Sequence, residues 1–288
     1  MARYIPFIFV LLWSTGFIGA KFGLPYAEPF TLLMWRMVFV VPLFLVLIFI
    51  FKRPKISVFD ASIQSLVGLF IHGFYLGAVF AAIDANIPAG LTALFVSLNP
   101  LIIAVFSGLV LNTNINKREW SGLLLGLLGV ITVLYGASSW EGVITVKGIA
   151  WLTFALAGIV AGTLLQKRYA KHVDLITGSF YQFAASLIFF AVMSLMLETG
   201  KVDWNINLVL TLAWLIIILS LIAVLLLLYM IRHGEAARVA SYFYLIPPFT
   251  AFWGWLFFDE LWNWLSILGA ALVVGALVLI RPNKKESE

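Results

Sequence analysis

The stretch YFYLIPPFTAFWGWLFFDE, residues 242–260, decides how the fold of this chain is interpreted. It is long and apolar enough to cross a lipid bilayer, which takes about 20 such residues. Pro247 and Pro248 nevertheless lie near its middle, where each removes a backbone donor and disfavours a regular helix. Irregular backbone at that depth is tolerated where protein or a watery cavity covers it. We therefore expect this segment to bend around a central site.

The composition excludes a water-soluble globule. The 288 residues are 63% hydrophobic and only 11% charged, and the mean hydropathy is +1.08, which is typical of a polytopic membrane protein. The chain has no cysteine, which excludes disulfides and thiolate metal sites. We expect no metal and no cofactor.

Charge clusters and turn residues divide the chain into ten apolar segments. We expect transmembrane helices near residues 3–24, 29–51, 60–83, 88–112, 117–136, 147–168, 174–197, 206–231, 236–258 and 263–281. The predicted fold class is an all-α polytopic membrane protein. The first segment also has the short basic start of a signal peptide, but we expect it to be retained because a matching segment occurs later in the chain.

The basic residues indicate the topology. Fourteen lie on the side of the termini: Arg3, Lys52, Arg53, Lys55, Lys117, Arg118, Lys167, Arg168, Lys171, Arg232, Arg238, Arg281, Lys284 and Lys285. The opposite side has three, Lys21, Lys147 and Lys201. Basic loops stay in the cytoplasm, so we expect both termini to be cytoplasmic in a bacterial-type inner membrane. The net charge of +5 therefore reflects topology and does not indicate nucleic-acid binding.

The two halves of the chain align at an offset of 146 to 148 residues. The matches pair Gly16, Lys21, Thr31, Trp35, Arg36, Ala89 and Pro100 with Gly162, Lys167, Thr177, Tyr181, Gln182, Ala237 and Pro248. Because the offset spans five helices, equivalent helices cross the membrane in opposite directions. We predict two inverted five-helix repeats, residues 1–139 and 140–288, an arrangement typical of transporters.

Three stretches also resemble a known family. They are PFTLLMWRMVF (29–39), FAAIDANIPAGLTALFVSLNPLIIAVFSGLVLN (80–112) and RHGEAARVASYFYLIPPFTAFWGWLFFDELWNWLSILGAALVVGALVLI (232–280). They are similar to the paired EamA repeats of the drug/metabolite transporter superfamily, and most like its YddG-type amino-acid exporters. The resemblance implies a carrier that exports amino acids or related metabolites by alternating access. The family's frequent Gly-Glu pair is Asp259-Glu260 here and Leu111-Asn112 in the first half, which weakens a role for symmetric glutamates in coupling.

Polar and aromatic side chains in the middle of the segments are the candidate substrate contacts: Trp13, Ser14, Arg36, His72, Tyr75, Asn99, Tyr229 and Tyr244. Arg36, about 10 Å from the outer end of its helix, could anchor a substrate carboxylate. It could instead snorkel to the outer interface, or cap a neighbouring helix near Glu28. His72 could contact substrate or make a helix-to-helix hydrogen bond. Aromatic faces with a few hydroxyls suit an amino acid with an aromatic or apolar side chain.

The prolines and glycines have two interpretations each. Pro100, Pro247 and Pro248 are candidate hinges for alternating access, or kinks repaired by local 3₁₀ geometry. Small residues in the fifth and tenth segments predict close-packing faces, used for scaffold contacts or for a homodimer: Gly122, Gly126, Gly129, Gly269 and Gly275.

Three rival functions fit the sequence less well. An intramembrane enzyme would need a nucleophile and base or a metal cluster, but the three histidines, His72, His172 and His233, are scattered. A channel is usually a symmetric oligomer around a polar pore, whereas this chain carries its own repeat. Efflux of hydrophobic cations would depend on an acidic residue inside the helices, and the acidic residues lie near segment ends, as Asp84 does. We therefore predict a carrier for a small molecule within the lipid bilayer.

Overall fold

The computed structural model describes residues 4–87, 89–111, 115–137, 145–233, 239, 241–258 and 264–280. The helices are α1 (Ile5–Gly23), α2 (Pro29–Ile50), α3 (Val58–Gly68), η2 (Leu69–Leu76), α4 (Gly77–Asp84), α5 (Ala89–Val96), α6 (Asn99–Leu111), α7 (Lys117–Ala137), α8 (Val146–Tyr169), α9 (Leu175–Leu197), α10 (Ile206–Trp214), η3 (Leu215–Ala223), α11 (Val224–His233), η4 (Tyr242–Leu245), α13 (Ile246–Phe258) and α14 (Trp264–Ile280). The described part of the chain contains one isolated bridge, Ala27 to Val202, and no strand. The predicted all-α class is confirmed.

Six uninterrupted helical runs are long and apolar enough to cross a membrane: residues 5–23, 29–50, 58–84, 146–169, 175–197 and 206–233. Each of these runs agrees with a predicted segment to within two residues at either end. The chain is a multi-pass membrane protein. Asn112, Ala237, Asp259 and Glu260, which entered the sequence comparison, lie outside the described residues.

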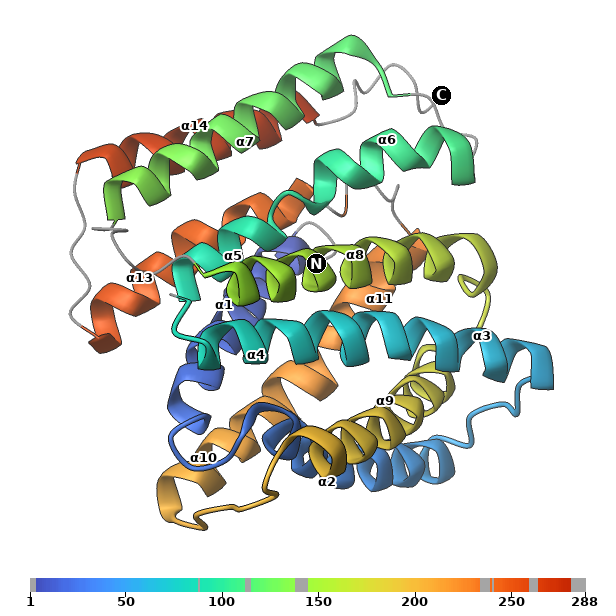
Figure 1. Cartoon of the computed structure of the whole chain (residues 1–288). Helices are drawn as coiled ribbons and strands as arrows, with labels where there is room; N and C mark the ends of the chain where they lie inside the picture. The colour runs from blue at the N-terminus through green and yellow to red at the C-terminus, as the bar shows by residue number, and fades with distance from the viewer. Residues whose placement is uncertain are drawn as a thin grey trace.

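Helices α7 and α14 lie side by side along one edge of the molecule, and α2 and α9 lie together at the opposite edge (Figure 1). One of the predicted close-packing glycines, Gly129, explains the first pair, because a Cβ there would come within 2.8 Å of the Gly269 carbonyl oxygen on α14. Gly126 allows a different contact: a Cβ there would come within 2.6 Å of the Tyr244 ring on η4. These glycines make contacts inside one chain, and Gly275 has only an ordinary contact with Leu125 at 3.9 Å. A homodimer through the outer faces of α7 and α14 remains a prediction.

Helices α2 and α9 run antiparallel and are tied together at both ends. At the start of α2, the Glu198 carboxylate accepts hydrogen bonds from the amides of Phe30 (2.7 Å) and Thr31 (2.6 Å). At the start of α9, Asp174 accepts from the amides of Ile176 and Thr177, at 3.1 and 3.0 Å. Carboxylates suit these positions because the first amides of a helix lack intrahelical acceptors.

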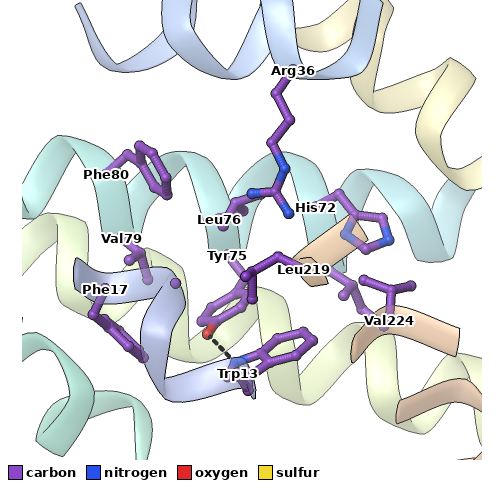
Figure 2. A pocket seen from close by; sticks show the side chains of 12 residues that line it. Trp13, Phe17, Arg36, His72, Tyr75, Leu76, Val79, Phe80, Leu219 and Val224 are labelled. Atoms are coloured by element: carbon purple, nitrogen blue, oxygen red, sulfur yellow. Dashed lines mark hydrogen bonds between the residues drawn. The ribbon is translucent and has the colours of Figure 1, made fainter. Parts of the chain in front are cut away.

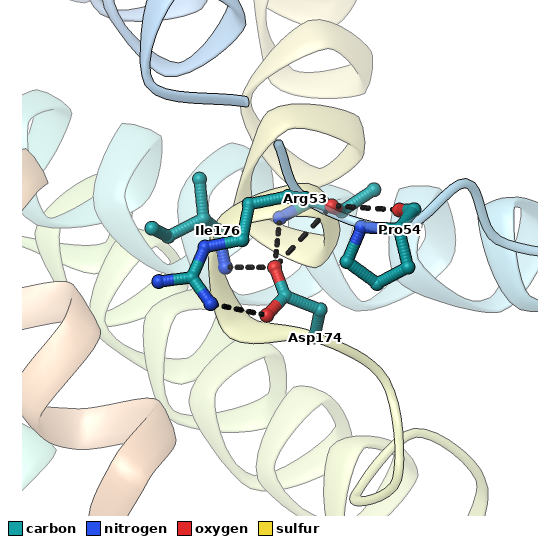
Figure 3. Close-up of polar contacts among 5 residues, drawn as sticks. Arg53, Pro54, Asp174 and Ile176 are labelled. Atoms are coloured by element: carbon teal, nitrogen blue, oxygen red, sulfur yellow. Dashed lines mark hydrogen bonds and ion pairs between the residues drawn. The ribbon is translucent and has the colours of Figure 1, made fainter. Parts of the chain in front are cut away.

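Additional contacts reinforce each end of this pair. The Arg53 guanidinium lies 3.5 Å from Asp174, and the Thr177 hydroxyl donates to the Pro54 carbonyl at 3.1 Å (Figure 3). At the other end, burial raises the pKa of Glu198, although the donors from Phe30 and Thr31 oppose that shift. The α2–α9 pair is therefore fastened by charge-assisted hydrogen bonds at its two ends.

The prolines of the opening stretch lie where new helices begin. The 3₁₀ turn η4 precedes α13, in which Pro247 and Pro248 are the second and third residues. In the fourth segment α5 ends at Val96, and Pro100 is the second residue of α6. First-turn amides have no intrahelical acceptor, so proline there loses no hydrogen bond. Local 3₁₀ geometry accompanies the break in η4, and the chain breaks at both predicted places.

Candidate functional site

Four of the predicted contact residues meet at one small cavity. Trp13, Arg36, His72 and Tyr75 line it together with apolar side chains that include Leu219 (Figure 2). Its volume is about 30 Å³, which is enough for about one water molecule. This volume is too small for an amino acid, so a larger solute fits only after the lining side chains move apart.

Two π-helical segments bring residues to this cavity. Segment η2 carries His72 and Tyr75, and η3 carries Leu219 and Ser220. They begin at residues 69 and 215, 146 positions apart, which is the offset of the sequence repeat. Single-turn π-helical insertions are frequent at functional sites because the wider turn re-aims side chains. The sequence analysis did not predict these segments.

Aromatic side chains form one side of the cavity. The Trp13 indole Nε1 donates to the Tyr75 hydroxyl at 3.2 Å, and the two rings are nearly parallel with centroids 6.3 Å apart. Behind Trp13 lie the rings of Phe9 and Phe243, at 5.1 and 5.9 Å. The Tyr75 hydroxyl accepts from Trp13, so its own proton remains available to donate.

Arg36 provides the positive charge of the site. Its side chain is only 4% exposed, and its Nε donates to the Ser220 hydroxyl at 2.8 Å. Within the described part of the chain, no carboxylate pairs with this guanidinium. The alternative that Arg36 snorkels towards Glu28 is wrong, because Arg36 points into the cavity (Figure 2) and Glu28 instead accepts from Thr199.

His72 makes a hydrogen bond to a neighbouring helix and also lines the cavity. Its Nε2 lies 3.3 Å from the Gln182 amide oxygen on α9, and its ring stacks on Phe183 with centroids 4.4 Å apart. The predicted helix-to-helix hydrogen bond is therefore present. His72 also lines the cavity, beside Arg36 and Tyr75.

The other four candidates lie outside this cavity. The Ser14 hydroxyl accepts from the Trp253 indole at 3.0 Å, and the Tyr244 hydroxyl donates to the Leu123 carbonyl at 3.0 Å. Tyr229 is 37% exposed and packs on His233. Asn99 is buried at the start of α6, and its amide has no hydrogen-bond partner within the described residues. Sequence position near the membrane centre does not determine which face of a helix a side chain occupies.

Three buried glutamines near His72 were missed as site residues. Gln64, Gln166 and Gln182 are each at most 1% exposed, and Gln182 had been noted only as the repeat partner of Arg36. Uncharged amides in apolar segments were the signal that could have identified them. No group of three or more His, Cys, Asp or Glu residues that could hold a metal ion occurs among the described residues.

Comparison with known proteins identifies the family. The model of the EamA-like transporter family matches residues 4–135 and 146–281. The chain belongs to this family. EamA-like transporters are membrane proteins. The predicted resemblance to the EamA family is confirmed, and the similarity to YddG-type exporters stays a prediction.

Relatives of this EamA-like transporter extend over nearly its whole length. The uncharacterized transporter YvbV of Bacillus subtilis is 24% identical over 96% of this chain and 90% of its own length. The uncharacterized inner membrane transporter YedA of Escherichia coli is also 24% identical, with the same coverage. The pseudopaline exporter CntI of Pseudomonas aeruginosa is 27% identical over 78% of each chain. A crystal structure with 20% identity superposes with a TM-score of 0.77 over 96% of this chain and 95% of its own, so the EamA-like fold is shared.

Proposed function

We propose that this membrane transporter is a carrier that exports amino acids with aromatic or apolar side chains, and related small metabolites, by alternating access around the cavity. The observation that carries the proposal is Arg36, a buried cation that faces an aromatic cavity without a carboxylate partner in the described residues. An unpaired buried charge is costly. The carboxylate of an amino acid would supply the missing partner.

The proposal includes ten transmembrane helices arranged as two inverted repeats, residues 1–139 and 140–288. Three observations support it. The family model matches once in each half, the π-helical segments are 146 residues apart, and α6 and α13 both have 13 residues and begin at 99 and 246. Threonines at equivalent positions, Thr31 and Thr177, also take part in the two end contacts of the α2–α9 pair.

The orientation and direction of transport also belong to the proposal. The excess of basic residues on the side of the termini favours cytoplasmic termini. The relative YedA is an inner membrane transporter, which supports an inner membrane, and the relative CntI is an exporter, which supports export. The described residues that line the cavity include no Asp or Glu, which favours an anionic or zwitterionic solute over a hydrophobic cation.

The test is a counterflow screen in proteoliposomes that contain the purified protein. We expect amino acids with aromatic or large apolar side chains to accelerate uptake of their labelled counterparts, whereas hydrophobic cationic drugs have no effect. Acceleration by the cations alone would overturn the proposal in favour of drug efflux. Single-channel currents in place of saturable exchange would favour a channel.

Trp13→Ala tests the aromatic side of the cavity. Removing the indole loses the ring contacts with the substrate, so we expect apparent affinity for aromatic substrates to fall about tenfold. Affinity for alanine or another small substrate should change by less than about twofold, since a small side chain leaves the indole uncontacted. The measurement is the concentration dependence of counterflow. Equal losses for large and small substrates would place Trp13 in the packing core alone.

Pro100→Ala and Pro248→Ala test the helix breaks as hinges. Each change lets the preceding turn continue as regular helix, so we expect exchange to slow severalfold with little loss of folded protein. Because the repeats are proposed to be inverted, the two variants should bias accessibility towards opposite membrane faces, measured by labelling of single introduced cysteines. Pro29→Ala is the matched control, since Pro29 begins the unbroken helix α2. Wild-type rates and accessibility in both variants would contradict the hinge role.

A further inference from the structure

A row of buried amides connects the cavity to one end of the helix bundle. Gln182 on α9 donates from Nε2 to the amide oxygens of Gln64 on α3 and Gln166 on α8. Its own oxygen lies 3.3 Å from His72 Nε2. Gln166 Nε2 in turn donates to the Ala170 carbonyl at 3.5 Å, at the C-terminus of α8.

The Ala170 carbonyl at the end of this row determines which group donates and which accepts in every hydrogen bond of the row. A backbone carbonyl can only accept, so the group that Gln166 turns towards Ala170 must be its NH₂ group. The Gln166 oxygen then faces Gln182, which must present its own NH₂ group there. The Gln182 oxygen is left for His72, whose Nε2 must therefore carry a proton.

This order determines the tautomer of His72. A neutral imidazole protonated at Nε2 has its lone pair on Nδ1. His72 makes no other hydrogen bond within the described residues, so Nδ1 is free to accept one. The Arg36 guanidinium and the Trp13 indole, two other polar groups that line the cavity, can only donate, and one of the two lone pairs of the Tyr75 hydroxyl already accepts from Trp13.

We propose that Gln166 and Gln182 are positioning residues that hold His72 with Nδ1 as the acceptor for the substrate ammonium group. This inference rests on the proposed function and specifies it: Arg36 binds the carboxylate of a zwitterion, and His72 binds its ammonium group. The ammonium keeps its proton, and no covalent step is involved. The site would then prefer α-amino acids over the corresponding 2-hydroxy acids, which have the carboxylate but no ammonium group.

The tautomer can be observed without substrate. In protein labelled with ¹⁵N-histidine, with His172→Gln and His233→Gln to leave one histidine, the nitrogen chemical shifts distinguish the two neutral forms. We expect the Nε2-protonated form alone. Gln166→Leu removes the acceptor of Gln182 whose own orientation is fixed by a backbone carbonyl, without changing a cavity residue. Gln64 remains as an acceptor, but it makes no other hydrogen bond within the described residues, so its amide can turn over together with that of Gln182. We therefore expect a mixture of both forms; Gln182→Met should do the same if Gln166→Leu does not fold.

Ser186→Ala is the matched control. Ser186 is also buried on α9. Its hydroxyl donates to the backbone carbonyls of Gly68 and Gln182 and not to the side-chain amides of the row, so the histidine spectrum should stay as in the parent. A parent protonated at Nδ1, or a Gln166→Leu spectrum identical to that of the parent, would overturn the positioning role.

Counterflow then tests the ammonium contact. In Gln166→Leu we expect the apparent KM for an aromatic amino acid to rise about tenfold, with the KM of its 2-hydroxy analogue unchanged. Equal changes for both compounds would overturn the ammonium assignment while leaving amino-acid transport in place. If the protein without the Gln166→Leu change transports neither compound, the proposed function and the ammonium assignment both fail. The nitrogen chemical shifts still decide which nitrogen of His72 is protonated.

Discussion

Arg36→Met is expected to abolish amino-acid exchange and at the same time to stabilise the ligand-free protein. The guanidinium is buried, and its assigned partner is the neutral Ser220 hydroxyl. Replacing a poorly compensated buried charge by an apolar side chain of similar volume stabilises proteins by roughly 1–4 kcal/mol. Loss of the anchor for a desolvated carboxylate should cost the bound state roughly 2–5 kcal/mol, which corresponds to a loss of affinity of roughly 30-fold to several thousandfold.

Both effects are measurable on one preparation. Thermal unfolding of the purified protein in detergent gives the stability change, and counterflow gives the transport change. Arg36→Lys is the control, because it keeps the charge but lacks the planar fork that binds a carboxylate with two hydrogen bonds; partial transport is expected. A lower melting temperature together with intact transport in Arg36→Met would show that Arg36 is a structural residue.

Gly68→Ala is expected to prevent formation of the folded protein. Gly68 ends α3 directly before the π-helical segment η2, and α9 crosses closely against it. A Cβ there would come within 2.3 Å of the Cα and carbonyl oxygen of Gln182. Backbone atoms cannot rotate away as a side chain can, so we expect a cost of about 3 kcal/mol or more.

The measurement is the monodisperse fraction after detergent extraction. Gly275→Ala is the matched control: Gly275 also lies within a helix, but the nearest atom to an added Cβ is 3.9 Å away, in Leu125. That variant should fold at least as well as the parent, because alanine favours a helix by about 1 kcal/mol over glycine. Normal yield of Gly68→Ala would mean that α3 and α9 can separate without loss of the fold.

The sequence predicts the helices well because apolar length is a local property. Hydropathy and charge clusters were enough to predict the six long spans. The missing backbone donor of proline was enough to predict the breaks at Pro100 and Pro247. Arg36, His72 and Tyr75 were found because polar or amphipathic groups are rare in apolar helices. What each group contacts depends on neighbouring helices, so the choice between Ser220 and Glu28 as the partner of Arg36 needed the structure.

The position of some candidates outside the cavity has the same origin. Ser14 adjoins Trp13 in sequence, but neighbouring positions lie about 100° apart around a helix, and Ser14 faces Trp253. The aromatic ring and hydroxyl of Tyr229 and Tyr244 make them candidates, but this chemistry does not indicate which way each side chain points. The π-helical segments depend on a shift of backbone hydrogen bonds from i+4 to i+5, for which these residues give no distinct pattern. Both segments, and the amide row beside η2, therefore required coordinates.

Because a break precedes each of them, α6 and α13 can each tilt as a rigid unit, and a small tilt displaces the far end of the helix. Thirteen residues at about 1.5 Å per residue make a rigid arm of about 20 Å, so a tilt of about 15° at the break moves the far end by about 5 Å. In the proposed topology the free end of α6 points to the cytoplasm and that of α13 to the outside. A rotation of α6 that leaves the cavity residues almost in place can therefore open a solute-sized gap at the cytoplasmic surface. The equivalent rotation of α13 opens one at the outer surface.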